Sequence, residues 1–403
     1  MSTQPFIKPP PKQDDGKDNT GCWIAGLLGC GCLFVLLVSA LLTGILYFAL
    51  NKPVSEMQAD AARPHSPVLQ AELDAIEMPA GFWQRPETLK ATETRNNTEV
   101  AAVKAMVKEL FLEGKFDLLD DLAQTYRTSD KRTYSGDFKL DIFYTALYEL
   151  QDEGMDYNKL YNELTRWYVK DTGNITPYVG VMRQSYKNAW AWRGDGYEVS
   201  PENKRNFVRG LEFAQKHIDE ARDRKVTHHD PAFYGDAIKV AMGLNHPYSK
   251  VRALVQKSRE VDAAYFPSYS AFAICMLPRW QGEKESDVVH FANEAAEWSK
   301  NEAGESAYAW VAYTIATYGK PNMQTFYKQY PFEWARVQQG FADWDREYPL
   351  TRKMMNGFLW LAVAAGDTKT ARGLFNTIGD EYDESVWKER KTYDEYRRRI
   401  VGP

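Results

Sequence analysis

One stretch near the start of the chain constrains its architecture more than any other feature. Trp23 to Leu50 form an apolar run, and no charged residue occurs between Asp18 and Lys52. A helix of this length spans roughly 42 Å at about 1.5 Å per residue, more than the roughly 30 Å hydrocarbon core of a bilayer. The run also exceeds the roughly 7–15 apolar residues of a cleaved signal peptide. We therefore predict a single, uncleaved transmembrane helix over residues 21–50.

Basic residues on the two sides of this helix set its expected orientation. Lys8, Lys12 and Lys17 precede it together with the amino terminus, whereas Lys52 and Arg63 follow it. Because basic residues are retained on the cytoplasmic side of a membrane, the small excess before the helix favours a cytoplasmic N-terminus. We therefore expect the rest of the chain to lie outside the cytoplasm.

Small residues recur four positions apart in the same helix, as in the pairs Ala25 and Gly29, and Ala40 and Gly44. This spacing lines one helix face with groups that let a second helix approach closely. Self-association through the transmembrane helix is therefore an alternative to a monomeric anchor.

Prolines and polar residues divide the chain on either side of the predicted helix. Residues 1–20 are polar and proline-rich, which predicts a disordered tail. Residues 51–95 hold five further prolines and indicate a juxtamembrane stalk. Residues 96–403 form the body, with candidate halves at 96–244 and 245–403.

Apolar residues in the body recur with helical spacing, as Ala102, Met106 and Leu110 do near its start. Glycine and proline fall between these segments, and the sequence lacks the alternating Val, Ile and Thr runs that predict strands. We therefore predict an all-α body. Beyond residue 130 the expected helices are 139–152, 155–169, 177–192, 202–223, 231–243, 248–264, 268–277, 285–299, 305–318, 332–346, 350–365, 368–377 and 384–399.

An internal repeat suggests how these helices are arranged. Aromatic-Pro pairs end at Pro267 and Pro349, 82 residues apart, and glycine turns follow at Gly282 and Gly366, 84 residues apart. Proline favours the first turn of a helix, so Pro267 and Pro349 are expected to begin helices at equivalent corners. Short helices joined by short turns are what stacked helical hairpins require, and we predict a solenoid-like body.

Short motifs in the body resemble two kinds of helical protein. Gly114-Lys115-Phe116 and Ala364-Ala365-Gly366-Asp367 are similar to the turns of tetratricopeptide repeats. A closer resemblance is to a bacterial family known as a helical domain of unknown function. It rests on Gly114-Lys115-Phe116-Asp117, Ala191-Trp192-Arg193-Gly194, Leu277-Pro278-Arg279-Trp280-Gln281-Gly282 and Ala365-Gly366-Asp367. This resemblance implies a helical-repeat-like fold with no assigned activity, and with the anchor it leads us to expect the bacterial inner (cytoplasmic) membrane.

The charge balance excludes some classes of ligand. The net charge of −5 lies in the body, because the first fifty residues hold three Lys and three Asp. This mixed, mildly acidic balance argues against a nucleic-acid surface, which needs a basic face. The sequence also lacks a glycine-rich phosphate loop and a Gly-x-Ser-x-Gly elbow. We therefore expect no cofactor and no nucleic acid.

Adjacent histidines offer the one candidate metal site. His228 and His229 precede Asp230 and Pro231. They lack the i, i+4 spacing that fixes two histidines on one helix face. The alternative, which we prefer, makes Asp230 the N-cap of the helix that starts at Pro231 and the histidines ordinary turn residues.

Glu305 is the candidate catalytic residue. Glu305-Ser306-Ala307-Tyr308, followed by Asn322-Met323-Gln324, is similar to elements of lytic transglycosylases, in which a glutamic acid protonates a glycosidic oxygen. Asn322 replaces the glycine of that family, and its downstream motifs are missing. The alternative is an acidic residue at a helix N-terminus, where negative charge is favourable.

The loop Leu277–Gly282 is the most unusual in the body, because Pro, Trp and Gly within six residues predict a fixed shape. Trp280 either fills a groove between helices or, with Arg279, contacts a ligand, since Trp and Arg are favoured binding anchors. Trp192 and Arg193, at a predicted helix end, are the other candidate partner-binding residues.

The sequence thus predicts a single-pass membrane protein whose helical-repeat body binds a protein or peptide partner. Two alternatives stay open. One is a cell-wall lytic enzyme acting through Glu305, and the other is a small-ligand-binding domain with a groove lined by some of the 12 Trp and 24 Tyr.

A reporter fused to Pro403 tests the predicted orientation. Because three lysines and the amino terminus precede the helix, we expect a reporter that is active only after export to be active there. An inactive export reporter, together with a fluorescent cytoplasmic reporter at the same point, would reverse the assignment.

Overall fold

The computed structural model describes residues 86–402, except 195–198, 227–228 and 319–320. Within these ranges the chain is helical and forms no strand, so the all-α prediction is confirmed for them. No helix among them is long and apolar enough to span a bilayer. The predicted tail, transmembrane helix and most of the predicted stalk, residues 1–85, lie outside the described residues.

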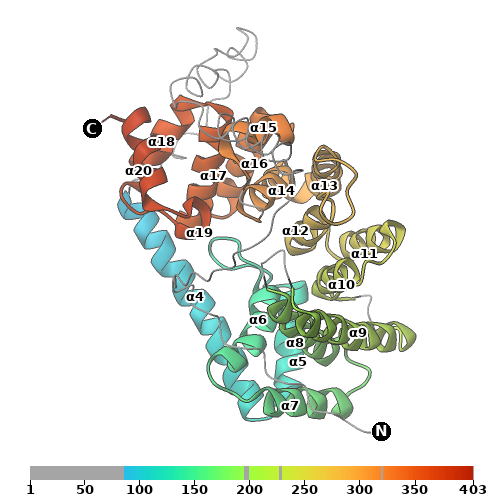
Figure 1. The fold of residues 1–403 in the computed structure, drawn as a ribbon. Helices are drawn as coiled ribbons and strands as arrows, with labels where there is room; N and C mark the ends of the chain where they lie inside the picture. Colours follow the sequence, from blue (N-terminus) through green and yellow to red (C-terminus); the bar gives the residue numbers. More distant parts are fainter. Residues whose placement is uncertain (1–85, 195–198, 227–228, 319–320, 403) are drawn as a thin grey trace, which may run out of the picture. The chain divides into compact units, whose positions relative to one another are not determined.

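The helices follow one another with short connections (Figure 1). They are α4 (Pro86–Leu112), α5 (Phe116–Thr128), α6 (Lys139–Asp152), α7 (Tyr157–Lys170), α8 (Ile175–Arg193), α9 (Pro201–Asp223), α10 (Pro231–Gly243), α11 (Tyr248–Val261), α12 (Phe266–Cys275), α13 (Asp287–Ala303), α14 (Ser306–Tyr318), η2 (Met323–Thr325), α15 (Phe326–Gln329), α16 (Trp334–Glu347), α17 (Arg352–Ala365), α18 (Thr368–Ile378), α19 (Glu384–Trp387) and α20 (Arg390–Ile400).

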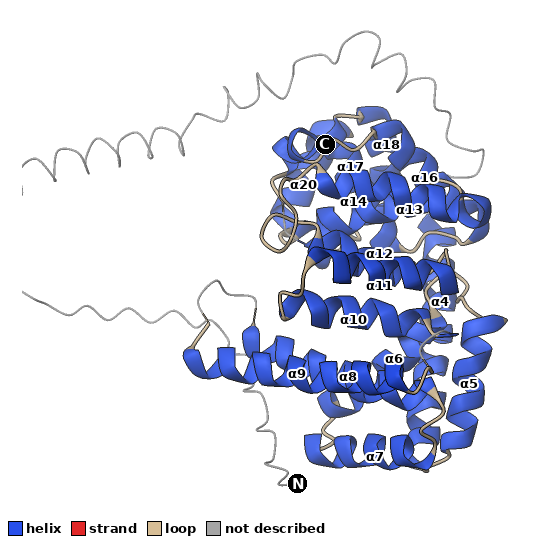
Figure 2. Cartoon of the chain, turned by 90° about the vertical axis from the view of Figure 1, so that its right-hand side faces the viewer, coloured by secondary structure: helices blue, strands red, loops and turns tan. Residues whose placement is uncertain are grey.

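Two sets of helices pack against each other. One set makes contacts in succession, from α6 through α8, α10, α12 and α14 to α17. The other set covers it, with α9 on α8, α11 on α10, α13 on α14 and α18 on α17. Figure 2 shows α9, α10, α11 and α12 lying side by side in this order. The sequences explain the difference, because α10 is buried along nearly its whole length whereas α11 buries only Val251, Val255 and Ser258.

The first described helix contacts both ends of this series. Helix α4 packs on α5 and α6, and near its start it also contacts α18 (Figure 1). The Glu93 carboxylate of α4 accepts a hydrogen bond of 3.0 Å from the backbone N–H of Arg352, the first residue of α17. Helices far apart in the sequence therefore hold each other in place.

The loop between α5 and α6, residues 129–138, lies among helices from distant parts of the chain. The Arg132 guanidinium lies 3.4 Å over the Phe138 ring centroid and donates a 2.7 Å hydrogen bond to the Ala264 carbonyl before α12. Burial lowers the pKa of Arg132 to about 10. Gly136 is needed for the close packing, because it has a φ of 86° and a Cβ would lie 2.7 Å from the Trp344 ring.

A buried ion pair joins four helices. Arg127 of α5 donates a 2.8 Å hydrogen bond to Asp230, the N-cap of α10, and both side chains are almost completely shielded from solvent. Arg127 also donates to the Tyr144 hydroxyl of α6 at 2.9 Å and the Thr176 hydroxyl of α8 at 2.8 Å. Because every partner is polar and close, the charges are compensated in the core.

Several sequence-based boundaries change, three of them with a clear structural reason. Residues 86–95 of the predicted stalk belong to α4. Pro267 lies in the first turn of α12, as predicted, but Pro349 lies in the turn before α17 and Thr351 caps that helix instead. The helix predicted over 384–399 is two helices, because Lys388 between them has a φ of 63°.

Removing one charge of the buried pair tests its role. Asp230→Asn keeps the shape of the side chain but leaves the Arg127 guanidinium buried without a carboxylate. We expect the free energy of unfolding to fall by about 3–5 kcal/mol, measured by urea unfolding of the full chain followed by circular dichroism. The control is Lys257→Gln, which breaks an exposed pair with Glu260 and should cost less than about 0.5 kcal/mol. Equal losses in the two variants would contradict the prediction.

Asp120 of α5 gives a pH-dependent prediction. Burial raises the pKa of Asp120 from its ordinary 3.8 to about 6, although its carboxylate accepts a 3.2 Å hydrogen bond from the Trp167 indole. The folded state therefore binds the proton more tightly than the unfolded state, and stability falls as the pH rises from 3.8 to about 6. Asp120→Asn removes this loss, so we expect it to gain roughly 1 kcal/mol at neutral pH, after allowance for partial exposure.

Unfolding curves of the wild type and Asp120→Asn at neutral and at strongly acidic pH measure this gain. The difference should vanish in acid, where the aspartic acid is protonated in both states. A gain that is the same at both pH values would show that burial of the charge is not its cause.

Candidate functional site

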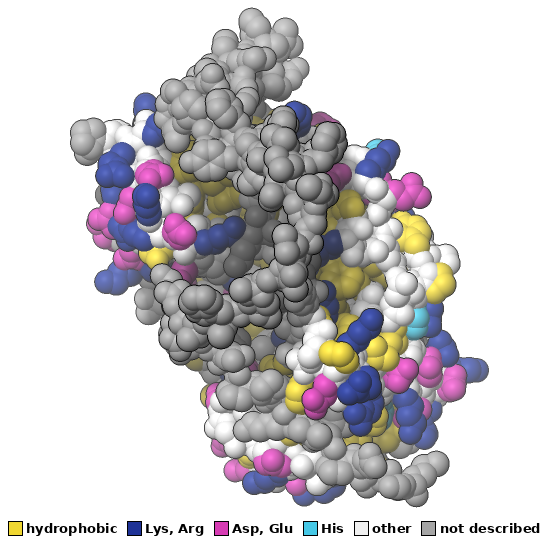
Figure 3. Space-filling view, viewed as in Figure 1, with side chains coloured by type: hydrophobic (Ala, Val, Ile, Leu, Met, Phe, Trp, Pro, Cys, Tyr) yellow, Lys and Arg dark blue, Asp and Glu magenta, His cyan; other side chains and the backbone are white. Residues whose placement is uncertain are grey.

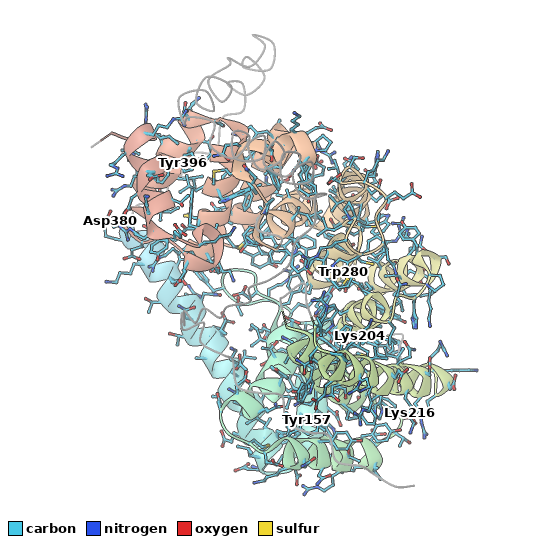
Figure 4. The ribbon with its side chains drawn as sticks, in the orientation of Figure 1. Tyr157, Lys204, Lys216, Trp280, Asp380 and Tyr396 are labelled. Carbon is cyan, nitrogen blue, oxygen red and sulfur yellow. The ribbon has the colours of Figure 1, made fainter. Side chains whose placement is uncertain are left out.

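The C-terminal ends of α8, α12 and α14 bring together side chains from two of the segments that the sequence singles out. We call this set the Trp–Arg row. It comprises Trp190 and Arg193 of the last turn of α8, Arg279 and Trp280 of the turn after α12, and Tyr318, the last residue of α14. Figure 4 labels Trp280 at the end of α12. In Figure 3, apolar side chains and Lys or Arg side chains lie next to each other over the region where Figure 1 draws α8 to α12.

The turn that carries Arg279 and Trp280 has the fixed shape expected from its sequence. The backbone N–H of Trp280 donates to the Leu277 carbonyl at 2.8 Å, and the N–H of Gln281 donates to the Cys275 carbonyl at 3.0 Å. A Cβ on Gly282 would lie only 1.8 Å from the Met276 carbonyl oxygen, so only glycine fits there. The Gln281 side chain donates to the His246 carbonyl and so attaches the turn to the end of α10.

Rings and guanidinium groups alternate along the row. The Trp190 and Trp280 rings meet edge to face with centroids 5.4 Å apart, and the Arg193 guanidinium lies 5.5 Å from the Trp280 ring. On the other side, the Arg279 guanidinium lies 5.5 Å from the Trp280 ring and 4.8 Å from the Tyr318 ring. Arg279 also donates a 2.6 Å hydrogen bond to the Tyr318 hydroxyl. Contacts of this kind hold the partly exposed Arg193 and the exposed Arg279 in place.

The row has hydrogen-bond donors that the described residues leave unused. Neither Arg193 nor Arg279 forms an ion pair with a described carboxylate; Arg193 donates only to the adjacent Gly194 carbonyl, at 3.0 Å. The indole N–H groups of Trp190 and Trp280 also lack an acceptor in the described part of the chain. The row therefore combines two arginines that have no carboxylate partner among the described residues with two tryptophans whose indole N–H groups are buried.

The sequence identified three of these five residues. Trp192, which the sequence offered with Arg193 as a candidate for binding a partner protein, is 8% exposed. It makes no ring contact with the described aromatic residues, so the structure does not bring it into the row. Trp190 takes its place. Trp280 packs on Trp190 of α8, as the structural alternative predicts, and the adjacent Arg279 is exposed.

Glu305 lies just before α14, close to the helix N-terminus as the non-catalytic interpretation predicts. Its carboxylate accepts hydrogen bonds from Arg336 at 2.8 and 3.0 Å, and its backbone N–H donates to Asp343 at 2.8 Å. An ion-paired carboxylate at the start of a helix is accounted for without catalysis. No second carboxylate contacts the Glu305 side chain among the described residues.

The candidate metal site at the histidine pair lies only partly within the described residues. His228 lies outside the described residues, and His229 is exposed. Asp230 accepts hydrogen bonds from the backbone N–H groups of Ala232 and Phe233, which confirms it as the N-cap of α10. Among the described residues, no group of three or more His, Cys, Asp or Glu side chains is suited to hold a metal ion.

A second polar group, which the sequence analysis missed, lies where α6, α8 and α10 meet. We call it the three-cation cluster. It contains Arg183 and Lys187 of α8, Lys239 and Asp236 of α10, and Asp141 of α6. The signal for it was the placement of Asp236 and Lys239, three residues apart, within the otherwise apolar helix α10.

No family model, curated protein or solved structure matches the chain. The geometry of the Trp–Arg row and of the three-cation cluster is therefore the basis for proposing a function.

Proposed function

We propose that the protein is a membrane-anchored scaffold of stacked helical hairpins that binds an acidic segment of a protein or peptide partner at the Trp–Arg row. The observation that carries this proposal is the presence of two arginines, Arg193 and Arg279, that contact aromatic rings but have no carboxylate partner among the described residues.

The chemistry of the row supports a polypeptide partner. Trp, Tyr and Arg are the residues that contribute most often to the binding free energy of protein interfaces. The guanidinium groups of Arg193 and Arg279 attract carboxylates, to which an arginine can donate two parallel hydrogen bonds. Because rings already hold the arginines, little side-chain entropy is lost on binding.

A purely structural role accounts for only part of this arrangement. Arginine near a helix C-terminus is favourable because it interacts with the negative end of the helix dipole. That effect explains Arg193 in the last turn of α8. It does not explain Arg279, which lies in a turn and extends across to Tyr318 of another helix.

The membrane location is part of the proposal. The apolar run over residues 21–50 supports a single-pass anchor with the body outside the cytoplasm. The resemblance to a bacterial helical family of unknown function supports an inner-membrane location and assigns no activity to the protein. A scaffold held near the bilayer encounters partners that are secreted or membrane-bound.

Site-specific photo-crosslinking in native membranes tests the proposed function. A photoreactive amino acid at exposed Pro278, next to Arg279, should form adducts with a partner whose crosslinked peptide is acidic. Arg279→Ala should weaken binding roughly thirtyfold, as expected for loss of an arginine worth about 2 kcal/mol, and should abolish most of the adduct.

The matched control is Arg259→Ala. The Arg259 guanidinium lies 4.9 Å over the Trp298 ring, so this change removes a similar exposed Arg–Trp contact outside the row. It should leave the adduct unchanged. Equal loss in both variants, or an adduct with a basic peptide, would overturn the proposal.

A further inference from the structure

The three-cation cluster shares no residue with the Trp–Arg row, although both use α8; the cluster lies where α8 meets α6 and α10. Arg183 and Lys187 lie one turn apart on α8, and Lys239 faces them from α10. The groups of α6 that face them are Asp141 and the Tyr148 ring. The site also contains Asp236, Tyr186 and Tyr265, which is the residue immediately before α12.

The two carboxylates of the cluster are already in use. Arg183 pairs with Asp236 at 2.6 Å and with Asp141 at 2.8 Å. Lys239 pairs with Asp236 at 3.2 Å and donates a 3.3 Å hydrogen bond to the Tyr186 hydroxyl. Both carboxylates therefore bind the guanidinium of Arg183, and one also binds Lys239.

Lys187 is the cation without a carboxylate. Its ammonium lies 5.2 Å from the Tyr148 ring centroid, and no described residue gives it an ion pair or a hydrogen bond. Burial lowers the pKa of Lys187, and the charges of Arg183 and Lys239 lower it further. Three cations and two carboxylates leave the cluster with one surplus positive charge.

The cluster also has too few acceptors. The Tyr265 hydroxyl interacts electrostatically with Arg183, Asp141 and Asp236, yet it has no hydrogen-bond partner although the residue is only 2% exposed. Buried polar groups without partners are rare and costly, and a bound anion is one remedy. Lys187 and Lys239 are both partly exposed, so the side chains of the cluster are not completely enclosed by protein.

We propose that the three-cation cluster binds one carboxylate group, received by the ammonium groups of Lys187 and Lys239. A single negative charge neutralises the surplus, whereas a phosphate dianion exceeds it. The carboxylate belongs either to a free small acid or to an acidic residue or C-terminus of a polypeptide. The competing explanation is a lysine that packs its stem on Tyr148 and keeps its ammonium in water.

The reactivity of Lys187 toward an amine-acylating reagent tests the proposal. The full chain is labelled at mildly alkaline pH and the extent of reaction at each lysine is read by mass spectrometry. Acetate should slow the labelling of Lys187 by about tenfold. Only the unprotonated amine reacts, and its fraction falls about tenfold when the pKa of the lysine rises by about one. The neutral analogue acetamide, and sodium chloride at the same ionic strength, should not. Exposed Lys159 and Lys250 are internal controls that should not respond.

Two substitutions are expected to change the protection of Lys187 by acetate in opposite directions. Lys239→Gln removes one receiving cation and should abolish protection by acetate, whereas Asp141→Asn removes a competing carboxylate and should strengthen it. Asp141 is 39% exposed, so this second change leaves the core intact. Helicity measured by circular dichroism checks the fold of both variants.

Further probes identify the source of the carboxylate. Protection by acetate supports a free acid, and protection only by a Glu-rich peptide supports a polypeptide. The proposal is overturned if neither protects Lys187, if acetamide protects as well as acetate, or if inorganic phosphate protects more strongly than both. Because Arg279→Ala should leave this protection unchanged, failure here and failure at the Trp–Arg row are distinguishable.

Discussion

The guanidinium of Arg132 holds the 129–138 loop against helices from the second half of the chain. It donates to the Ala264 carbonyl before α12, and its face lies on Phe138. The rings of Trp344 in α16 and of Tyr348, the residue after α16, lie within 5.6 Å of it. A planar guanidinium can donate hydrogen bonds at its edge while its face contacts rings, which an ammonium cannot do. The packing of α12 and α16 around the loop therefore depends on the shape of this cation as well as on its charge.

Compensated charges in the core recur around this loop. The pairs Arg127–Asp230 and Arg183–Asp236 each connect α10 to earlier helices. Such pairs add little stability compared with a well-packed apolar core, but they tolerate few alternative arrangements of the helices. We attribute to them the alignment of α5, α6, α8 and α10. Lys187 differs from these structural charges because it has no carboxylate partner among the described residues, and this difference singles it out as a candidate for binding.

Local patterns in the sequence were sufficient to locate most helices. The bounds of α6 and α10 match the predicted ranges, because apolar spacing and nearby Gly or Pro act over a few residues. The break at Lys388 has no such local signal. It depends on tertiary packing, because the preceding Trp387 packs on Phe375 and Tyr393 of other helices.

The candidate sites were harder to predict from the sequence. The loop with Arg279 and Trp280 was recognisable because its composition is unusual. Trp190, and not the candidate Trp192, contacts Trp280, because residues two apart point to different sides of a helix and only the packing of α8 on its neighbours decides which side meets Trp280. The same packing creates the three-cation cluster.

The long-range hydrogen bonds have a consequence for how the chain folds. Ser135 and Trp344 are 209 residues apart, and Glu93 and Arg352 are 259 apart, yet each pair is joined directly. A linear array of helical hairpins can form one unit at a time, because each unit contacts only its neighbours. Here the early helices complete their contacts only after the last ones have been synthesised, which raises the contact order and slows folding. The nascent chain must therefore keep apolar helix faces uncovered for most of its synthesis, a period in which assistance by chaperones is most valuable.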